Sequence, residues 1–206
     1  MANLITLATY KELQHINNSN HDFVLSSFID SVSQLVKTYC NNTFVDYFNT
    51  PYTEVFTIDY AKTFVQLRES PLCIDRTLVN GEQTKPIIVR ERPSLQGAYV
   101  TLVDNVDYYA DYASDSIYRV TGNAYSLFPL GPGSVEITYY AGYQETPEDL
   151  KLAVMDLVTY YHKEQSKQRQ SLAGASITNV TSSSQKNAVD FPDHIKRVLD
   201  LHKQFA

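Results

Sequence analysis

The stretch from Val135 to Gln165, VEITYYAGYQETPEDLKLAVMDLVTYYHKEQ, says most about the fold of this chain. Its first residues read as a β-strand, and a glycine then permits a turn. Thr146 and Pro147 predict the N-cap and the first position of a helix, and the acidic residues after them suit the positive end of the helix dipole. The apolar residues that follow recur at steps of three and four: Leu150, Ala153, Val154, Leu157, Val158 and Tyr161. The chain therefore passes here from a sheet into a long amphipathic helix.

Two more helices are predicted before this point. The first covers the segment TLATYKELQHI, and the second follows the capping pair Ser19 and Asp22 and ends near Cys40. From about Thr53 to Tyr140 the pattern changes to short strands separated by Gly, Pro and Asn, as in an antiparallel β module.

After the long helix, residues 166–190 are small, polar and nearly uncharged, which predicts a flexible arm. A short closing helix is predicted from Pro192. The expected fold class is α+β: a helical bundle of two N-terminal helices, one long central helix and a short C-terminal helix, with an inserted antiparallel β module. Residues 1–44 and 141–206 would form the helical part, and residues 45–140 the β-rich insertion.

Composition excludes several classes of protein. The chain of 206 residues is 43% hydrophobic and 19% charged, which is typical of folded proteins. A net charge of -6 argues against a protein that grips nucleic acid through its phosphates, but it is compatible with a surface past which DNA slides. Cys40 and Cys73 form no disulfide framework, and no apolar run approaches the roughly 18 residues that span a bilayer.

The sequence carries no recognisable catalytic, metal-binding or cofactor-binding residues. No two of the five histidines have the i, i+4 spacing of a helical zinc site. Cys40 is best explained as a small buried hydrophobic residue, although a nucleophile is the alternative. The basic cluster Lys163, Lys167 and Arg169 suits the negative end of a helix, with contact to DNA phosphates as the alternative.

Three motifs together resemble the head–tail connector family (adaptor or head completion proteins) of tailed bacteriophages. The first is YCNNTF, with Tyr39, Cys40 and Phe44. The second is SPLCIDRTLVNG, in which Pro71, Leu72, Ile74 and Gly81 match. The third is the opening stretch, whose matching residues are Tyr139, Ala141, Gly142, Tyr143, Pro147, Asp149, Leu150, Lys151, Ala153, Leu157 and Tyr161.

The resemblance implies a structural virion protein rather than an enzyme. Such proteins form a homo-oligomeric ring beneath the portal protein, usually with twelve-fold symmetry, and they complete the DNA-filled head. They extend the channel for double-stranded DNA and dock the tail or a tail-completion (stopper or nozzle) protein. The chain would then lie in the virion neck, and in the host cytoplasm during assembly, with no cofactor and no membrane partner.

Two sets of residues follow from this interpretation. The motif residues expected to shape the structure are Tyr39, Phe44, Pro71, Tyr139, Gly142, Pro147, Leu150 and Ala153. The residues expected to meet a partner, mainly the portal, lie in the arm and the flanking helices: Lys163, Lys167, Arg169, Leu172, Ile177, Val180, Phe191, Ile195 and Leu199.

Two other hypotheses stay open. A tyrosine-rich β module of a tail protein could bind a glycan or receptor, through Tyr108 or Tyr109 in the run DYYADYA. An unrecognised hydrolase could use histidine and aspartate residues, with His162 or His194 as the histidine to test.

Overall fold

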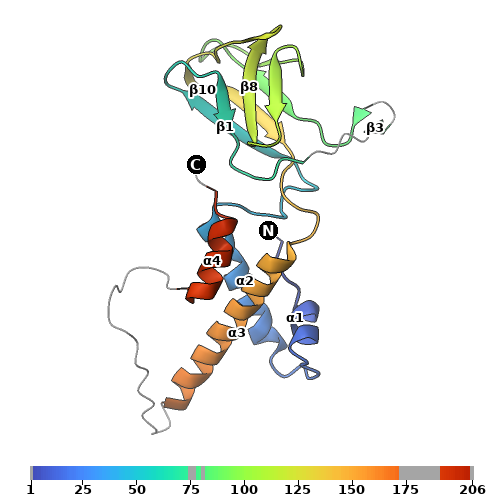
Figure 1. Ribbon diagram of the computed structural model, residues 1–206, viewed down its shortest axis with the longest axis vertical. Helices are drawn as coiled ribbons and strands as arrows, with labels where there is room; N and C mark the ends of the chain where they lie inside the picture. The colour runs from blue at the N-terminus through green and yellow to red at the C-terminus, as the bar shows by residue number, and fades with distance from the viewer. Residues whose placement is uncertain (1, 74–77, 80–81, 172–190, 205–206) are drawn as a thin grey trace. The chain divides into compact units, whose positions relative to one another are not determined.

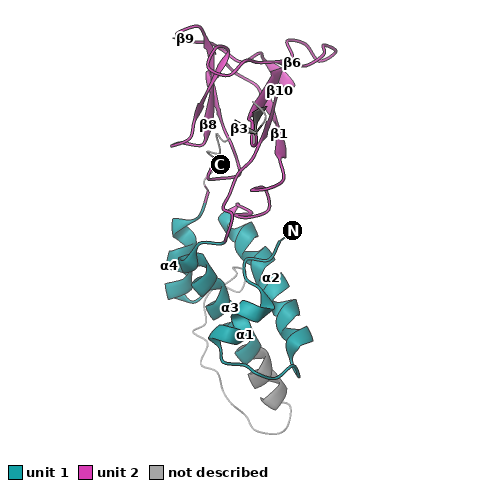
Figure 2. Ribbon diagram, turned by 90° about the vertical axis from the view of Figure 1, so that its right-hand side faces the viewer, with its two compact units in different colours: residues 1–40, 146–203 teal, residues 41–145, 204–206 magenta. Residues whose placement is uncertain are grey.

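The computed structural model describes residues 2–73, 78–79, 82–171 and 191–204 (Figure 1). The chain divides into two compact units, coloured separately in Figure 2. The helical unit comprises residues 1–40 and 146–203, and the β unit comprises residues 41–145 and 204–206.

Four helices build the helical unit: α1 (Leu7–Leu13), α2 (Asp22–Cys40), α3 (Glu148–Ser171) and α4 (Asp193–Leu201). The Thr6 side chain caps α1 by accepting a hydrogen bond from the Thr9 amide. Helix α2 contacts the other three helices, and α3 also contacts α4. Their apolar stripes form a core whose members include Leu25, Ile29, Val32, Val36, Leu150, Val154, Leu157, Val158, Ile195 and Leu199.

The β unit contains two main antiparallel sheets. The strands are β1 (Tyr52–Ile58), β2 (Phe64–Gln66), β3 (Leu78–Val79), β4 (Glu82–Gln83), β5 (Ile88–Glu91), β6 (Val100–Thr101), β7 (Tyr108–Asp111), β8 (Ser116–Thr121), β9 (Ala124–Tyr125) and β10 (Gly131–Tyr139). One sheet has the order β1-β10-β5-β6, and the other has β2-β8-β7 with β9 also paired to β8. Strands β3 and β4 form a separate pair.

The two main sheets bury one continuous apolar cluster. Side chains alternate along each strand, so that Val135, Ile137 and Tyr139 of β10 are fully buried. The cluster also draws on both sheets and their connections, through Ile58, Val65, Leu67, Leu72, Val89, Leu102, Tyr108, Ala110, Ile117, Phe128 and Ala141. The β unit therefore has a hydrophobic core of its own.

The predicted helical bundle with one long central helix is wrong. The structure shows four helices together with two mostly antiparallel sheets. The physical reason is that periodicity predicts which face of an element is buried, but not which elements share a core. The strands bury their apolar faces in a cluster built from residues of the β unit.

Element ends also differ from the predictions. Helix α3 begins at Glu148, one residue later than predicted, and the Pro147 carbonyl accepts the hydrogen bond from the Lys151 amide. The helix runs on to Ser171, so the first residues of the predicted arm are helical. Residues 172–190 of that arm, and the motif residues Ile74 and Gly81, lie outside the described residues.

Candidate functional site

The motif residues of the β unit meet where β10 ends. Gly142 has a φ of +94°, and its amide donates a hydrogen bond to the Pro71 carbonyl at 2.8 Å. A Cβ atom at this position would lie 2.1 Å from the carbonyl oxygen of Phe44. We call this end of β10 the join. Only glycine can occupy position 142, because both its backbone angle and the close approach of the Phe44 carbonyl exclude a side chain.

A buried asparagine holds the segments of this join in place. Asn42 is only 4% exposed; its amide nitrogen donates to the Ser70 carbonyl at 2.8 Å, and its oxygen accepts from the Phe44 amide at 2.9 Å. Phe44 itself is buried and has a φ of +64°. The asparagine thus supports a backbone turn that a non-glycine residue adopts at a cost.

Two glutamates and a tyrosine complete the network. The Tyr139 hydroxyl donates to Oε2 of Glu54 at 3.0 Å and accepts from the Glu69 amide at 3.1 Å. Oε2 of Glu69 accepts from both the amide and the hydroxyl of Thr43, at 2.9 and 2.8 Å. Burial raises the pKa of Tyr139 far above its usual range and also raises the pKa of Glu54. We call Asn42, Thr43, Glu54, Glu69, Ser70 and Tyr139 the join network.

The join network suits support better than catalysis. Each carboxylate is engaged by backbone or hydroxyl donors that hold neighbouring segments together, and the raised pKa of Tyr139 keeps its hydroxyl protonated as a donor. Fully satisfied buried networks of this kind rigidify a structure and specify one arrangement of it.

In the helical unit, the motif residue Tyr39 joins α2 to α4. Its hydroxyl donates to Oδ1 of Asp200 at 2.5 Å, and its ring meets Phe191 edge-on with centroids 4.9 Å apart. The Cys40 thiol donates to the Leu199 carbonyl, and burial raises the pKa of Cys40 to about 12. A thiol held protonated in this way is a packing residue, not a nucleophile.

The predicted partner-interface residues fall into three groups. Phe191, Ile195 and Leu199 are at most 3% exposed, so their side chains are buried inside the helical unit. Lys163 is exposed and lines a shallow groove of about 280 Å³ between α3 and α4. The others are not described at the level of side chains: Lys167 and Arg169 lie in α3, and Leu172, Ile177 and Val180 lie outside the described residues. A role of any of these residues in partner binding stays a prediction.

The histidines occupy separate settings. The His162 ring lies against the rings of His21 and Phe28, with centroids 6.3 and 6.0 Å away. Nε2 of His202 lies 2.8 Å from Oδ2 of Asp149. Within the described parts of the chain, no three His, Cys, Asp or Glu side chains are grouped so that they could hold a metal ion. No helix in those parts is both long and apolar enough to cross a membrane.

The two tyrosines named for glycan binding point in different directions. Tyr108 is buried, and its hydroxyl donates to the Ile87 carbonyl at 2.7 Å. Tyr109 is exposed and, with Tyr125, lines a shallow pocket of about 270 Å³. Strand alternation explains the difference, because neighbouring residues face opposite sides of a sheet.

The β unit also has a larger groove that the sequence does not predict. It has a volume of about 490 Å³ and is lined by residues of β1 and β2 and of the turn between them, together with Asn41, Leu67, Arg68 and Gln204. The alternating patterns of TEVFTIDY and TFVQLRE predict these two strands. They do not show that both strands are sheet edges, because pairing partners are distant in sequence.

The sequence matches the family model described as "Head completion protein" over residues 3–205. The head completion protein of Escherichia phage T5 is 29% identical over 91 residues, which are 42% of this chain. This match spans half (50%) of the length of that relative.

Solved structures from gene transfer agent (GTA) particles have a similar fold. A chain from the neck of an empty particle, computed with C6 symmetry, is 14% identical with a TM-score of 0.58, covering 98% of this chain and 91% of that one. A chain from the neck of a native particle, computed with C12 symmetry, has a TM-score of 0.56 at 14% identity and covers 100% and 96%. With a family model that matches nearly its whole length, this chain belongs to the head completion protein family.

Proposed function

We propose that this chain is a structural protein of the phage neck that forms a dodecameric ring beneath the portal. The ring completes the DNA-filled head, extends the DNA channel and docks the tail or a tail-completion protein. The observation that carries this proposal is the family match over residues 3–205, supported by the similar fold of chains in GTA necks.

The physical properties of the chain support the same role. A ring subunit must keep one geometry while identical copies meet it head-to-tail, and the join network gives the β unit that rigidity. The net charge of -6 favours passage of DNA without adhesion. Connector function requires no reacting groups, and the buried Cys40 and Tyr139 are held in their protonated forms.

The test is assembly on the portal. Purified chain mixed with the portal protein of its own phage should add a ring of density to one end of the portal in negative-stain electron microscopy. Antibody against the chain should label the neck of intact particles. Absence of the chain from purified virions, or no association with the portal between low and physiological salt, would contradict the proposal.

A second candidate function is glycan binding by the β unit. The observation in its favour is the shallow pocket where Tyr109 and Tyr125 lie beside Asn105 and Asn123, because aromatic rings and amides together suit a sugar. A glycan array probed with the native chain and with Tyr109→Ala distinguishes this candidate. Binding that is lost in the variant supports it, and an array without signal removes it.

A further inference from the structure

The groove between β1 and β2 is bounded by the edges of two different sheets. Glu54 and Phe56 of β1 and the residues from Phe64 to Leu67 line it. β1 is the terminal strand of one main sheet, and β2 is the terminal strand of the other. Edge strands present backbone N–H and C=O groups that are ready to pair with another chain. Each of these two edge strands is therefore a candidate for pairing with an added strand.

The pairing of β2 shows which of its groups face the groove. The Thr63 carbonyl accepts from the Arg119 amide, and the Leu67 amide donates to the Asp115 carbonyl, so the odd-numbered residues pair with β8. Backbone groups alternate in direction along an antiparallel strand. The N–H and C=O groups of Phe64 and Gln66 consequently point away from β8, and they have no backbone partner among the described residues.

The open part of this edge has a defined start. The Lys62 carbonyl accepts a hydrogen bond from the Phe128 amide at 3.0 Å, so the chain itself occupies the edge at that residue. The open backbone groups are therefore those of Phe64 and Gln66. An added strand would begin its pairing where the contact with Phe128 ends.

Two cations flank the open edge. Lys62 and Arg68 both line the groove, and neither forms an ion pair with a carboxylate in the described residues. The ammonium of Lys62 lies over the ring of Tyr60, 4.7 Å from its centroid. The acidic side chain of the groove, Glu54, already accepts hydrogen bonds from the Arg68 amide and the Tyr139 hydroxyl. An incoming segment thus meets two positive charges that can pair with it.

The spacing of these charges defines the segment that fits. Lys62 and Arg68 are six residues apart in the sequence, and a partner segment in extended conformation covers on the order of 20 Å over six residues. Phe64 and Gln66 lie between them, so a strand that pairs with these two residues places alternate side chains beside them, and its flanking residues extend toward Lys62 and Arg68. The exposed Phe64 gives β2 an apolar side chain between the two charges, and Phe56 also lines the groove.

We propose that this groove binds an extended segment of another neck protein, which adds to the edge of β2 as a strand. The segment carries carboxylates six residues apart, which pair with Lys62 and Arg68, and apolar side chains on the same face between them. Main-chain hydrogen bonds to Phe64 and Gln66 supply affinity, and the two charges set register and specificity. That the partner is a neck protein rests on the proposed function; the groove and its chemistry do not.

A peptide tests the chemistry of the groove directly. The probe is acetyl-Glu-Thr-Val-Thr-Val-Thr-Glu-amide, added at up to millimolar concentration to the isotope-labelled full chain. Nuclear magnetic resonance should show shifts confined to residues around the groove, and amide exchange at Phe64 and Gln66 should slow at least tenfold. The control peptide with Lys in place of both Glu residues should bind at least tenfold more weakly. No selective shift at millimolar peptide would overturn the proposal.

Two variants separate charge from backbone pairing. The double variant Lys62→Glu, Arg68→Glu should reverse the preference and bind the Lys peptide better than the Glu peptide. Gln66→Pro removes an N–H that faces the groove and leaves the β8 pairing intact, which edge strands tolerate. It should abolish binding of either peptide, whereas Gln66→Thr should bind normally. A Gln66→Pro chain that keeps the native spectrum and still binds would contradict strand addition.

The identity of the occupant needs one further measurement. Sedimentation of the native chain and of Gln66→Pro without peptide should show the same oligomeric state. If the native chain self-associates and Gln66→Pro does not, a second copy occupies the groove and the proposed foreign partner is wrong. Assembly on the portal is measured separately. The proposed function can therefore prove wrong while the groove still binds peptide, and the groove can fail to bind peptide while the chain still assembles on the portal.

Discussion

Each of the two units of this protein is stabilised internally, and the stabilising interactions differ between them. The helical unit closes on apolar stripes, with a few polar contacts at its margin such as the bond between Tyr39 and Asp200. The β unit has an apolar core as well, but its join at Gly142 depends on buried polar groups, among them Asn42 and Glu69. The helical unit should therefore tolerate changes in polar residues and respond to lost volume. The stability of the join should change when a single hydrogen-bonding or closely packed atom is removed or added.

The largest effect is expected for Gly142→Ala. The added Cβ would meet the Phe44 carbonyl at 2.1 Å in a backbone conformation with φ of +94°. We expect a loss of roughly 4 kcal/mol or more in the free energy of unfolding, because both strain and overlap must be relieved. The matched control is Gly122→Ala, whose φ is +62° and whose Cβ would meet nothing within 4 Å; it should cost about 1 kcal/mol. Equal costs in denaturant titrations would show that the close approach is unimportant.

Leu199→Ala should destabilise the helical unit by about 2–5 kcal/mol, since it opens a cavity at a fully buried position. Hydrogen exchange should report faster opening in α2, α3 and α4 and little change in β10. Leu201→Ala in the same helix is the control, because Leu201 is 81% exposed and should stay within about 0.5 kcal/mol of the native chain. Equal loss of protection in both units would remove the distinction between them.

Asn42→Ala should cost about 1–3 kcal/mol, because it leaves the Ser70 carbonyl and the Phe44 amide without their partner. The exposed Asn123 provides the comparison: Asn123→Ala should be nearly neutral. Thermal unfolding of the two variants side by side measures the difference. If Asn42→Ala is as stable as Asn123→Ala, buried polar groups do not hold the join.

Glu54→Gln should have the smallest effect, and its sign depends on pH. Burial raises the pKa of Glu54 above its usual value of 4.5, so its stabilising contribution is fully present below that pH and is lost as pH rises through the folded pKa. Glutamine still accepts the hydrogen bonds from Tyr139 and Arg68 and has no charge to bury. The variant should thus equal or exceed the native stability at neutral pH, and the gain should shrink as pH falls through the folded pKa toward 4.5. A variant much less stable at neutral pH in urea titrations would show that the charge itself is needed.

Much of the local structure can be predicted because its signals are local. The step of three and four residues in α3, and the alternation in β10, each follow from side-chain geometry within one element. Gly142 can also be identified from its motif. The physical reason for a glycine at this position cannot be predicted, because it is the close approach of Phe44, a residue almost a hundred positions away in the sequence.

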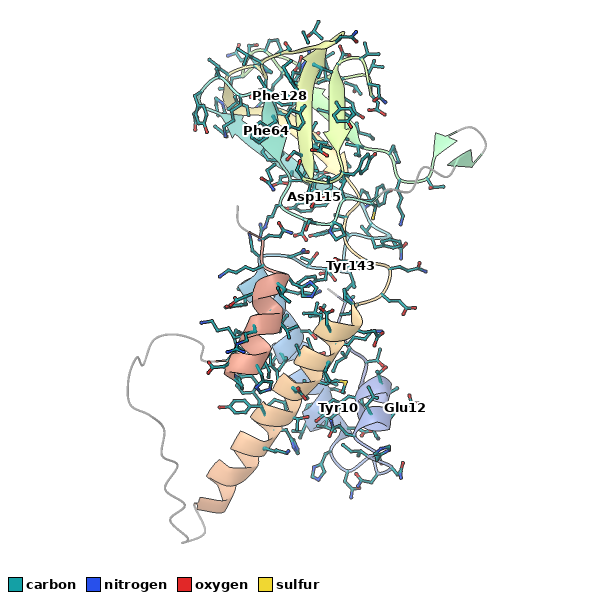
Figure 3. All side chains as sticks on the ribbon, viewed as in Figure 1. Tyr10, Glu12, Phe64, Asp115, Phe128 and Tyr143 are labelled. Atoms are coloured by element: carbon teal, nitrogen blue, oxygen red, sulfur yellow. The ribbon has the colours of Figure 1, made fainter. Side chains whose placement is uncertain are left out.

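The predicted interface residues show what a local pattern does not reveal. Phe191, Ile195 and Leu199 form an apolar stripe that suits docking to a partner as well as it suits an internal core. The periodicity of such a stripe does not say which surface the helix covers. The structure buries these residues against the chain's own helices. Figure 3 draws the described side chains on the ribbon of both units. No local sequence pattern specifies which of them become neighbours.

By itself, the sequence determined the kind of each main element, the positions of its apolar faces and the family to which the chain belongs. These depend on periodicity and on short motifs, which act within a few residues. The tertiary structure alone decided that the strands form two sheets with a separate core, that β1 and β2 are edges facing one groove, and that the join network is buried. Those features depend on pairings between distant segments, and burial makes their hydrogen bonds obligatory only after the chain has folded.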